Sequence, residues 1–157
     1  MTIAPIILIA DRHDDALKCL KEELPTPFAL FHARNGLEAS FVLNHRKSLI
    51  AAAVVELELP FVNGFDLIGR LTGKHPKPKK IIATTCLEHD VLFALAKYMG
   101  ADAIVRKPVP KQTLIDMLRP LVHEVRTMVN LRHEARPRQI DRARTATHDA
   151  KSNRRGT

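Results

Sequence analysis

Residues 5–11 read PIILIAD, an uninterrupted apolar run that ends in an acidic side chain. A strand buried on both faces of a parallel sheet has this composition, because helices cover both sides and leave no solvent-facing positions. The acid at its end, Asp11, indicates that the carboxyl end of the strand opens into a polar site. The stretch therefore predicts an α/β protein with a functional edge near Asp11.

Four more β-prone runs follow along the chain, each bounded on one side by proline. They lie at residues 28–33, 49–59, 79–86 and 101–106. Stretches of helical periodicity separate the strands, at 14–24, 37–46, 65–72 and 89–99. Strict alternation implies right-handed crossovers and a parallel sheet covered on both faces. Such a sheet binds its ligand at the carboxyl ends of the strands, which here carry Asp11, Arg12, Glu56, Thr84, Thr85 and Lys107.

The length of 157 residues and the 45% apolar content suit one domain with a single core and an additional segment. No apolar run approaches the roughly 18–20 residues that span a bilayer, and the N-terminus lacks the basic start of a signal peptide. The two cysteines, Cys19 and Cys86, form neither a disulfide framework nor a metal clip, which suits a reducing compartment. We therefore expect a cytoplasmic protein without membrane contact.

The C-terminal part divides into a helix and a basic tail. Apolar residues spaced by four and three positions run from Leu114 to Met128, and Pro120 predicts that this helix is bent or split. The second half is either a docked or fraying extension of the last helix or a dimerising segment. Residues 132–157 hold eight basic and three acidic residues, a net charge of +5. With few large apolar groups, residues 133–157 are expected to be disordered.

Five local motifs fall in the order and at the spacings of a known family. They are the strand ending in Asp11, the segment Ala33-Arg34-Asn35-Gly36-Leu37-Glu38-Ala39, the turn Leu59-Pro60-Phe61-Val62-Asn63-Gly64, Thr85, and Gly100-Ala101-Asp102 leading to Lys107-Pro108. Over residues 5–122 the chain resembles the CheY-like receiver domain of two-component response regulators. The resemblance implies a flavodoxin-like, three-layer α/β/α sandwich with a five-stranded parallel sheet in the order 2-1-3-4-5. With the C-terminal features described above, we expect a receiver-like domain over 1–122, a helical extension over 123–132 and the basic tail over 133–157.

The chemistry of that family needs five groups. They are an aspartate acceptor after the third strand, two acids after the first strand that hold Mg²⁺, a Thr or Ser, and a Lys. The metal and the Lys neutralise charge on the transferring phosphoryl group. Asp11, Thr85 and Lys107 match three of these positions.

The two remaining positions depart from the family. Counting back four residues from Pro60 places Glu56 at the acceptor position, and Arg12 stands where the family has its second acid. Glutamate is longer by one methylene, roughly 1.5 Å, which spoils an in-line geometry in a cramped site. Arg12 removes an oxygen ligand and adds a permanent positive charge. We therefore expect weak or absent Mg²⁺ binding, no other cofactor and no aspartyl phosphorylation.

Three interpretations of this degenerate site remain open. Asp14 and Asp15 could serve as replacement metal ligands, although acids in a first helical turn also complement the helix dipole. Alternatively, the acids of the site pair with its two cations and only keep it folded, with Glu56 reaching towards Lys107 or Thr85. In the third interpretation Glu56 partly imitates a phosphorylated aspartate and holds Thr85 inward, with one negative charge where an acyl phosphate has about two.

The resemblance also implies a switch and an output surface. Three residues before Lys107 the family usually has an aromatic switch residue, and Ile104 stands there in this chain. The output surface of the family comprises the fourth helix, the fifth strand and the fifth helix, through which receivers dimerise or dock partners. Its candidates here are Phe93, Lys97, Tyr98, Arg106 and Lys111, although the two aromatic residues would also suit packing against neighbouring helices.

Together, these features predict an atypical stand-alone response regulator, or pseudo-receiver, in a bacterial cytoplasm. We expect it to lack enzymatic activity and to act through a protein partner such as a histidine kinase or another regulator, or as a homodimer. One alternative is a receiver that still responds to a histidine kinase phosphorelay. Another is a nucleic-acid-associated regulator whose basic tail contacts phosphates, although that tail lacks aromatic residues for base stacking.

Overall fold

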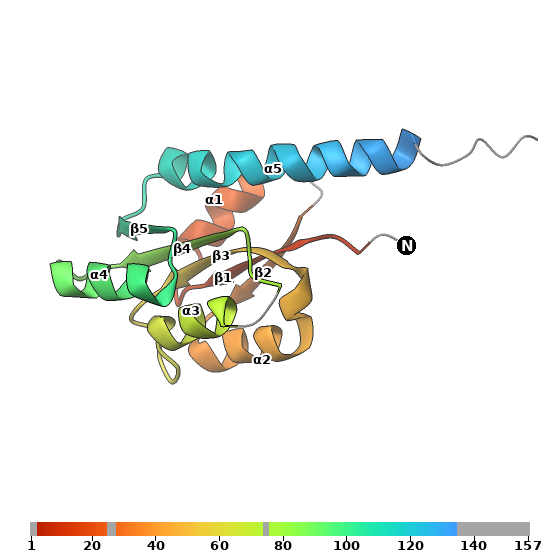
Figure 1. Cartoon of the computed structure of the whole chain (residues 1–157). Coiled ribbons are helices and arrows are strands. Elements are labelled where there is room, and N and C mark those ends of the chain that lie inside the picture. The colour runs from red at the N-terminus through yellow and green to blue at the C-terminus, as the bar shows by residue number, and fades with distance from the viewer. Residues whose placement is uncertain (1–2, 25–27, 74–75, 135–157) are drawn as a thin grey trace, which may run out of the picture.

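The computed structural model describes residues 3–24, 28–73 and 76–134. Strands and helices alternate along these residues as predicted (Figure 1). In chain order they are β1 (Ile6–Ala10), α1 (Asp15–Glu23), β2 (Ala29–Ala33), α2 (Gly36–Arg46), a 3₁₀ turn (Lys47–Leu49), β3 (Ile50–Glu56), α3 (Gly64–Thr72), β4 (Lys80–Thr85), α4 (Asp90–Met99), β5 (Ala103–Arg106) and α5 (Lys111–Glu134).

All the strand pairs are parallel, and the sheet has the order β2-β1-β3-β4-β5, which confirms the predicted topology. The pairing register decides where the functional edge lies. Ala10 is paired with Val55, and Glu56 is paired with Thr84. Asp11 follows Ala10, so Asp11 and Glu56 lie at the same level on neighbouring strands. The predicted site residues therefore lie at one edge of the sheet.

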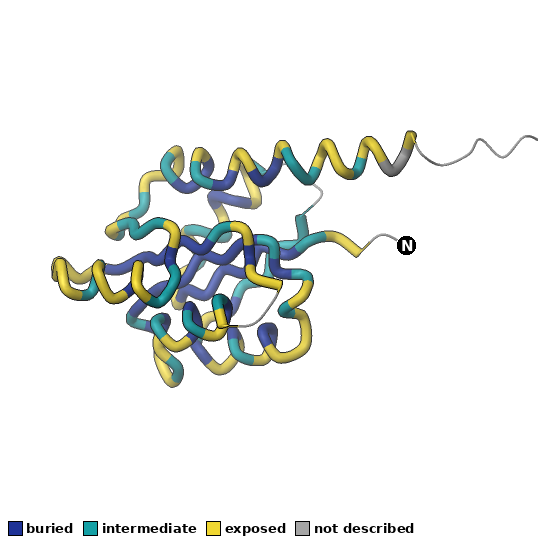
Figure 2. Tube along the Cα trace, in the orientation of Figure 1, coloured by how far each residue is buried: buried dark blue, intermediate teal, exposed yellow. Residues whose placement is uncertain are grey.

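Helices cover both faces of the sheet, as the continuous apolar strands require. On one face α1 and α5 pack against side chains such as Ile7, Ile9 and Val54. On the other, α2, α3 and α4 pack against alternate residues such as Leu8 and Val55. Figure 2 shows the buried strands between these two exposed helical layers. The three-layer α/β/α sandwich is thus confirmed, with one apolar core on each side of the sheet.

The last helix departs from one prediction. We expected Pro120 to bend or split it, and the split is wrong, because α5 continues from Lys111 to Glu134 with the proline inside. Pro120 lies on the exposed side, and the carbonyl that loses its donor, four residues earlier at Asp116, belongs to an exposed residue. Water can solvate that carbonyl, while Leu118 and Leu121 remain buried on either side of the proline. Continuous packing therefore outweighs the missing hydrogen bond.

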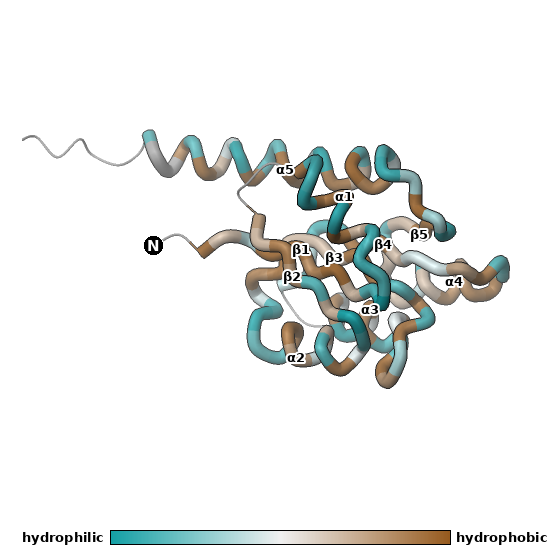
Figure 3. Tube along the Cα trace, turned by 180° about the vertical axis from the view of Figure 1, so that it is seen from behind, coloured by the Kyte–Doolittle hydropathy of each residue, from teal (hydrophilic) through white to brown (hydrophobic). Residues whose placement is uncertain are grey.

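Beyond the proline the helix leaves the sheet gradually. Val125 still packs against the core, whereas Met128 is 50% and Leu131 59% exposed. Figure 3 shows this last part of α5 extending past the sheet with apolar and polar positions mixed along it. The tail predicted over 133–157 begins as helix at 133–134, and its remainder lies outside the described residues. None of the helices in the described part combines the length and apolar character needed to cross a bilayer.

Candidate functional site

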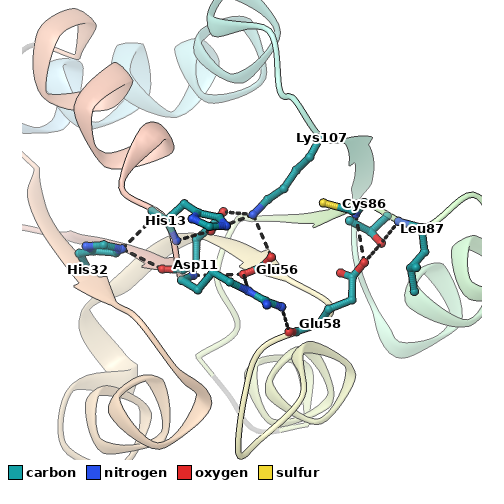
Figure 4. A network of polar contacts seen from close by, with 10 residues as sticks. Asp11, His13, His32, Glu56, Glu58, Cys86, Leu87 and Lys107 are labelled. Atoms are coloured by element: carbon teal, nitrogen blue, oxygen red, sulfur yellow. Dashed lines mark hydrogen bonds and ion pairs between the residues drawn. The ribbon is translucent and has the colours of Figure 1, made fainter.

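The carboxyl ends of β1, β3 and β4 and the residue that follows β5 form one polar site. Asp11 and Arg12 follow β1, Glu56 ends β3, Thr85 ends β4 and Lys107 follows β5. Figure 4 shows their polar contacts from close by. Asp11, Arg12, Glu56 and Lys107 form what is called the charge cluster below.

The turn after β3 explains how Glu56 is held in place. Asn63 caps α3 by accepting a hydrogen bond from the backbone N–H of Asp66 at 2.9 Å. The next residue, Gly64, lies so close to the strand end that an added Cβ would be 2.7 Å from the Cα of Leu57. The Gly64 N–H also donates to the Leu57 carbonyl at 3.0 Å. The Asn-Gly pair of the sequence motif therefore fixes the backbone beside Glu56.

Glu56 uses both of its carboxylate oxygens within the cluster. Its side chain is only 3% exposed. The Oε2 atom accepts hydrogen bonds from the backbone N–H of Arg12 at 3.1 Å and from its Nε at 3.2 Å. The Oε1 atom pairs with the Nζ of Lys107 at 3.0 Å. Of the two contacts expected for Glu56, the one with Lys107 is present.

Lys107 lies between two carboxylates. Its Nζ is 2.8 Å from Oδ1 and 2.7 Å from Oδ2 of Asp11, in addition to the contact with Glu56. Asp11 Oδ1 also accepts a hydrogen bond from the backbone N–H of His13 at 2.9 Å. Two carboxylates therefore face one ammonium and one guanidinium, so the charges of the cluster sum to zero.

The electrostatics of the cluster favour its charged form. Burial by itself raises the pKa of the Glu56 carboxyl, but hydrogen bonds from the Arg12 backbone and Lys107 outweigh it and hold this pKa below the ordinary value of 4.5. Burial likewise lowers the pKa of the Lys107 ammonium, but Asp11 and Glu56 raise it above the ordinary 10.5. Both groups are therefore ionised across the neutral pH range.

Glu58 is a site residue that the sequence reasoning missed. Thr85, which is fully buried, donates its hydroxyl to Glu58 Oε1 at 2.5 Å, and the backbone N–H of Cys86 donates to the same oxygen at 3.0 Å (Figure 4). The prediction that Glu56 holds Thr85 is therefore corrected: Glu58 makes that contact. The Thr85 hydroxyl in turn accepts from the backbone N–H of Leu87 at 3.0 Å.

His32, from the end of β2, was also missed. Its Nε2 lies 2.8 Å from the carbonyl oxygen of Asp11 and 3.2 Å from that of His13. One ring nitrogen thus contacts two carbonyls of the loop between β1 and α1. The histidine thereby ties β2 to the loop that carries Arg12. No sequence motif marks His32, since its role depends on β2 lying beside β1.

The donor set does not suit a hard divalent cation. Mg²⁺ requires oxygen ligands in near-octahedral geometry. Here the oxygens of Asp11 and Glu56 already accept from Lys107 and Arg12, and a cation among them would have to displace these two positive groups. Asp14, a candidate replacement ligand, instead pairs with Lys18 on α1 at 3.2 Å. The cluster therefore does not fit the metal that the family resemblance implies.

The remaining predicted residues lie away from the charge cluster. Ile104 is half-buried on β5 and packs against the core beneath α2, α3 and α4. On α4, Phe93 is half-buried, Lys97 is exposed and Tyr98 is 86% exposed. Of the two aromatic residues, Phe93 is thus partly packed and Tyr98 faces solvent.

Two further candidates of the output surface are engaged in ion pairs. Arg106 pairs with Glu88 at 2.8 Å. Lys111 pairs with Glu22 of α1, also at 2.8 Å. Lys111 therefore faces the side of the sheet that carries α1, away from α4.

Comparison with known proteins agrees with the fold. The chain matches the family described as response regulator receiver domain over residues 7–119. It is 30% identical over 104 residues to the response regulator GtcR of Aneurinibacillus migulanus, a match that covers 65% of this chain and 41% of GtcR. The matched region thus spans less than half the length of that relative.

Solved structures of receivers have the same fold. The signal receiver domain of an HD domain-containing protein from Pseudomonas fluorescens Pf-5 is 26% identical with a TM-score of 0.66, and the match covers 80% of this chain and 99% of that one. A response regulator from Burkholderia pseudomallei, whose structure contains a phosphorylated aspartic acid, a calcium ion and citrate, is 22% identical with a TM-score of 0.62. That match covers 82% of this chain and 74% of the other.

Proposed function

We propose that this chain, which belongs to the response regulator receiver domain family of two-component signalling, is a pseudo-receiver that acts without aspartyl phosphorylation. The observation that carries the proposal is the pairing of Glu56. The residue at the acceptor position is a glutamate, and its two oxygens are held by Arg12 and Lys107. A nucleophilic carboxylate needs an oxygen in line with the phosphorus, and both oxygens of Glu56 already contact positively charged groups.

The poor fit of the site to a metal ion also supports a receiver that is not phosphorylated. The related Burkholderia structure holds a calcium ion and a phosphorylated aspartic acid. In this chain the guanidinium of Arg12 already supplies positive charge beside the acceptor position. A cation there would be repelled by Arg12, and the incoming phosphoryl group would lack the metal ion that orients it for transfer.

The contact between Thr85 and Glu58 supports a signalling state that is independent of phosphoryl groups. The Thr85 hydroxyl is donated to a carboxylate oxygen of the chain itself at 2.5 Å. An incoming phosphoryl group would have to compete with this charge-assisted hydrogen bond. We therefore infer that the chain presents one arrangement of this edge of the sheet, and that its activity depends on which partner it meets.

The partner is proposed to be a protein that docks on the face of α4. Val91 is 76% and Tyr98 86% exposed on this helix, with Lys97 next to Tyr98. Exposed tyrosine is typical of protein interfaces, and Val91 adds apolar surface on the same helix. A histidine kinase, another regulator or a second copy of the chain would suit this surface. No catalytic activity is assigned.

The proposed location is a bacterial cytoplasm. Neither Cys19, which is buried, nor Cys86, which is exposed, takes part in a disulfide. Unpaired cysteines suit a reducing compartment.

Exposure of the protein to acetyl phosphate and Mg²⁺, followed by intact-protein mass spectrometry, tests the proposal. We expect no phosphoryl adduct on the natural chain. The double variant Arg12→Asp with Glu56→Asp, which restores the two family ligands, is the matched control and is expected to gain one adduct. An adduct on the natural chain that is lost in Glu56→Gln would contradict the proposal.

A further inference from the structure

A cavity of about 610 Å³ lies between α1 and the loop that leads from β5 into α5. Its wall is mainly apolar and includes Ala16 and Cys19 of α1, Val54 of β3, Val109 of the loop and Leu114 of α5. This volume is within the range of about 300–1,000 Å³ that is typical of small-molecule sites. At one end the lining reaches Asp11 and Lys107, so the cavity adjoins the charge cluster.

Thr84 supplies an unpaired polar group in this wall. The residue belongs to the cavity lining and is 1% exposed, and its buried hydroxyl has no hydrogen-bond partner among the described residues. Alternation along β4 places Thr84 on the same side as Ile82, which belongs to the core beneath α1 and α5. A buried hydroxyl without a partner costs free energy, so a molecule that fills the cavity and bonds to it gains an interaction.

The lysines around the cavity disfavour an anionic occupant, and its mainly apolar wall disfavours a charged ligand of either sign. Three lysines belong to the lining, and each already has a carboxylate partner. Lys111 pairs with Glu22 at 2.8 Å, Lys18 pairs with Asp14 at 3.2 Å, and Lys107 pairs with both acids of the charge cluster. An anionic ligand would have to break one of these pairs to be neutralised, whereas a neutral ligand would leave all of them intact.

We propose that this cavity binds a small, uncharged, largely apolar molecule with one hydrogen-bonding group directed at Thr84. Such a ligand would contact Asp11 and Lys107 from the side of α1 and α5. It would thereby act on the ion pairs that hold Glu56, and would be the input signal of the receiver in place of a phosphoryl group. Only this role as input rests on the proposed function; the binding itself does not.

Titration of the full chain with indole tests the site, followed by amide NMR without Mg²⁺ or phosphoryl donors. Indole is neutral and apolar and carries one N–H. We expect saturable shifts centred on Cys19, Thr84, Val109 and Leu114, and weaker binding of indole-3-acetate, which is anionic. Thr84→Val removes the hydroxyl at nearly constant shape and is expected to weaken indole binding by roughly fivefold. The affinity for 1-methylindole, which has no donor, should change little.

Two further variants complete the test. Ala16→Leu fills the cavity from α1 and should abolish the shifts, whereas Thr127→Val, on the exposed side of α5, should leave them unchanged. Well-dispersed spectra of each variant establish that it is folded.

Silence up to the solubility limit of indole would mean that only water occupies the cavity and would overturn the proposal. Shifts that persist in Ala16→Leu, or tighter binding of the anion, would also overturn it. Because no phosphoryl donor is present, this result is independent of the acetyl phosphate experiment.

Discussion

Two glutamates at the end of β3 have opposite surroundings. Glu56 is almost fully buried, and its oxygens face the cations of Arg12 and Lys107. Glu58, two residues later, is half-buried, and one of its oxygens accepts from the Thr85 hydroxyl and a backbone N–H. Its Oε2 is buried and has no hydrogen-bond partner within the described residues.

The two carboxylates differ in the charge of their partners. A carboxylate removed from water needs opposite charge or strong hydrogen bonds to remain ionised, and Glu56 has both. In Glu58 a hydroxyl and an amide contact one carboxylate oxygen, and the other oxygen is buried without a partner among the described residues. The acceptor position of this receiver is therefore neutralised by the chain itself, and the neighbouring position holds the threonine in place.

Removal of Lys107 should have the largest effect on stability. Lys107→Met would leave Asp11 and Glu56 buried without their shared ammonium, and loss of one partner of a buried pair costs about 3–5 kcal/mol. Urea unfolding at pH 7 measures this loss. Lys97→Met on the exposed face of α4 is the matched control and should change the free energy of unfolding by less than about 0.5 kcal/mol. Equal effects of the two variants would show that the charge cluster contributes nothing to stability.

Neutralising each glutamate in turn measures its contribution to the free energy of unfolding. Glu56→Gln removes a charge that two cations contact, and should lower the free energy of unfolding by about 2 kcal/mol. Glu58→Gln keeps a carbonyl oxygen for Thr85 and should cost about 1 kcal/mol or less. Both variants are measured by the same urea titration. A larger loss of stability for Glu58→Gln than for Glu56→Gln would contradict this account of the two glutamates.

Acid should reduce the difference in stability between the natural chain and Glu56→Gln. The pKa of Glu56 is lowered in the folded chain, so its contribution to stability is complete above the ordinary value of 4.5 and is lost as the pH falls through the folded value. The stability gap between the natural chain and Glu56→Gln should therefore be constant above about pH 5.5 and shrink below 4.5. Unfolding curves from pH 3 to pH 7, on a roughly one-unit grid, measure it. A gap that widens in acid would mean that the pKa is raised.

The parts of the site that could be predicted are those fixed by strand ends and by motifs. Apolar runs located the strands, and parallel pairing then placed Asp11, Glu56 and Lys107 at one edge of the sheet. The spacing back from Pro60 identified Glu56, and its predicted contact with Lys107 is present.

The errors lie where tertiary contacts decide. The contact between Glu58 and Thr85 depends on the path of the turn after β3, where strand alternation no longer predicts the direction of a side chain. His32 contacts the loop after β1 only because β2 is its neighbour in the sheet. Pro120 was expected to interrupt α5, but core packing on both sides of it preserves the helix.

The central claim is that the charge cluster takes the place of phosphoryl chemistry at this edge of the sheet. Titration of the full chain with Mg²⁺ and beryllofluoride, followed by amide NMR, tests this claim most directly. We predict no saturable shifts at Asp11, Arg12, Glu56, Thr85 or Lys107, and clear shifts at the same positions in the double variant Arg12→Asp with Glu56→Asp. Saturable shifts in the natural chain that disappear in Glu56→Gln would contradict the account.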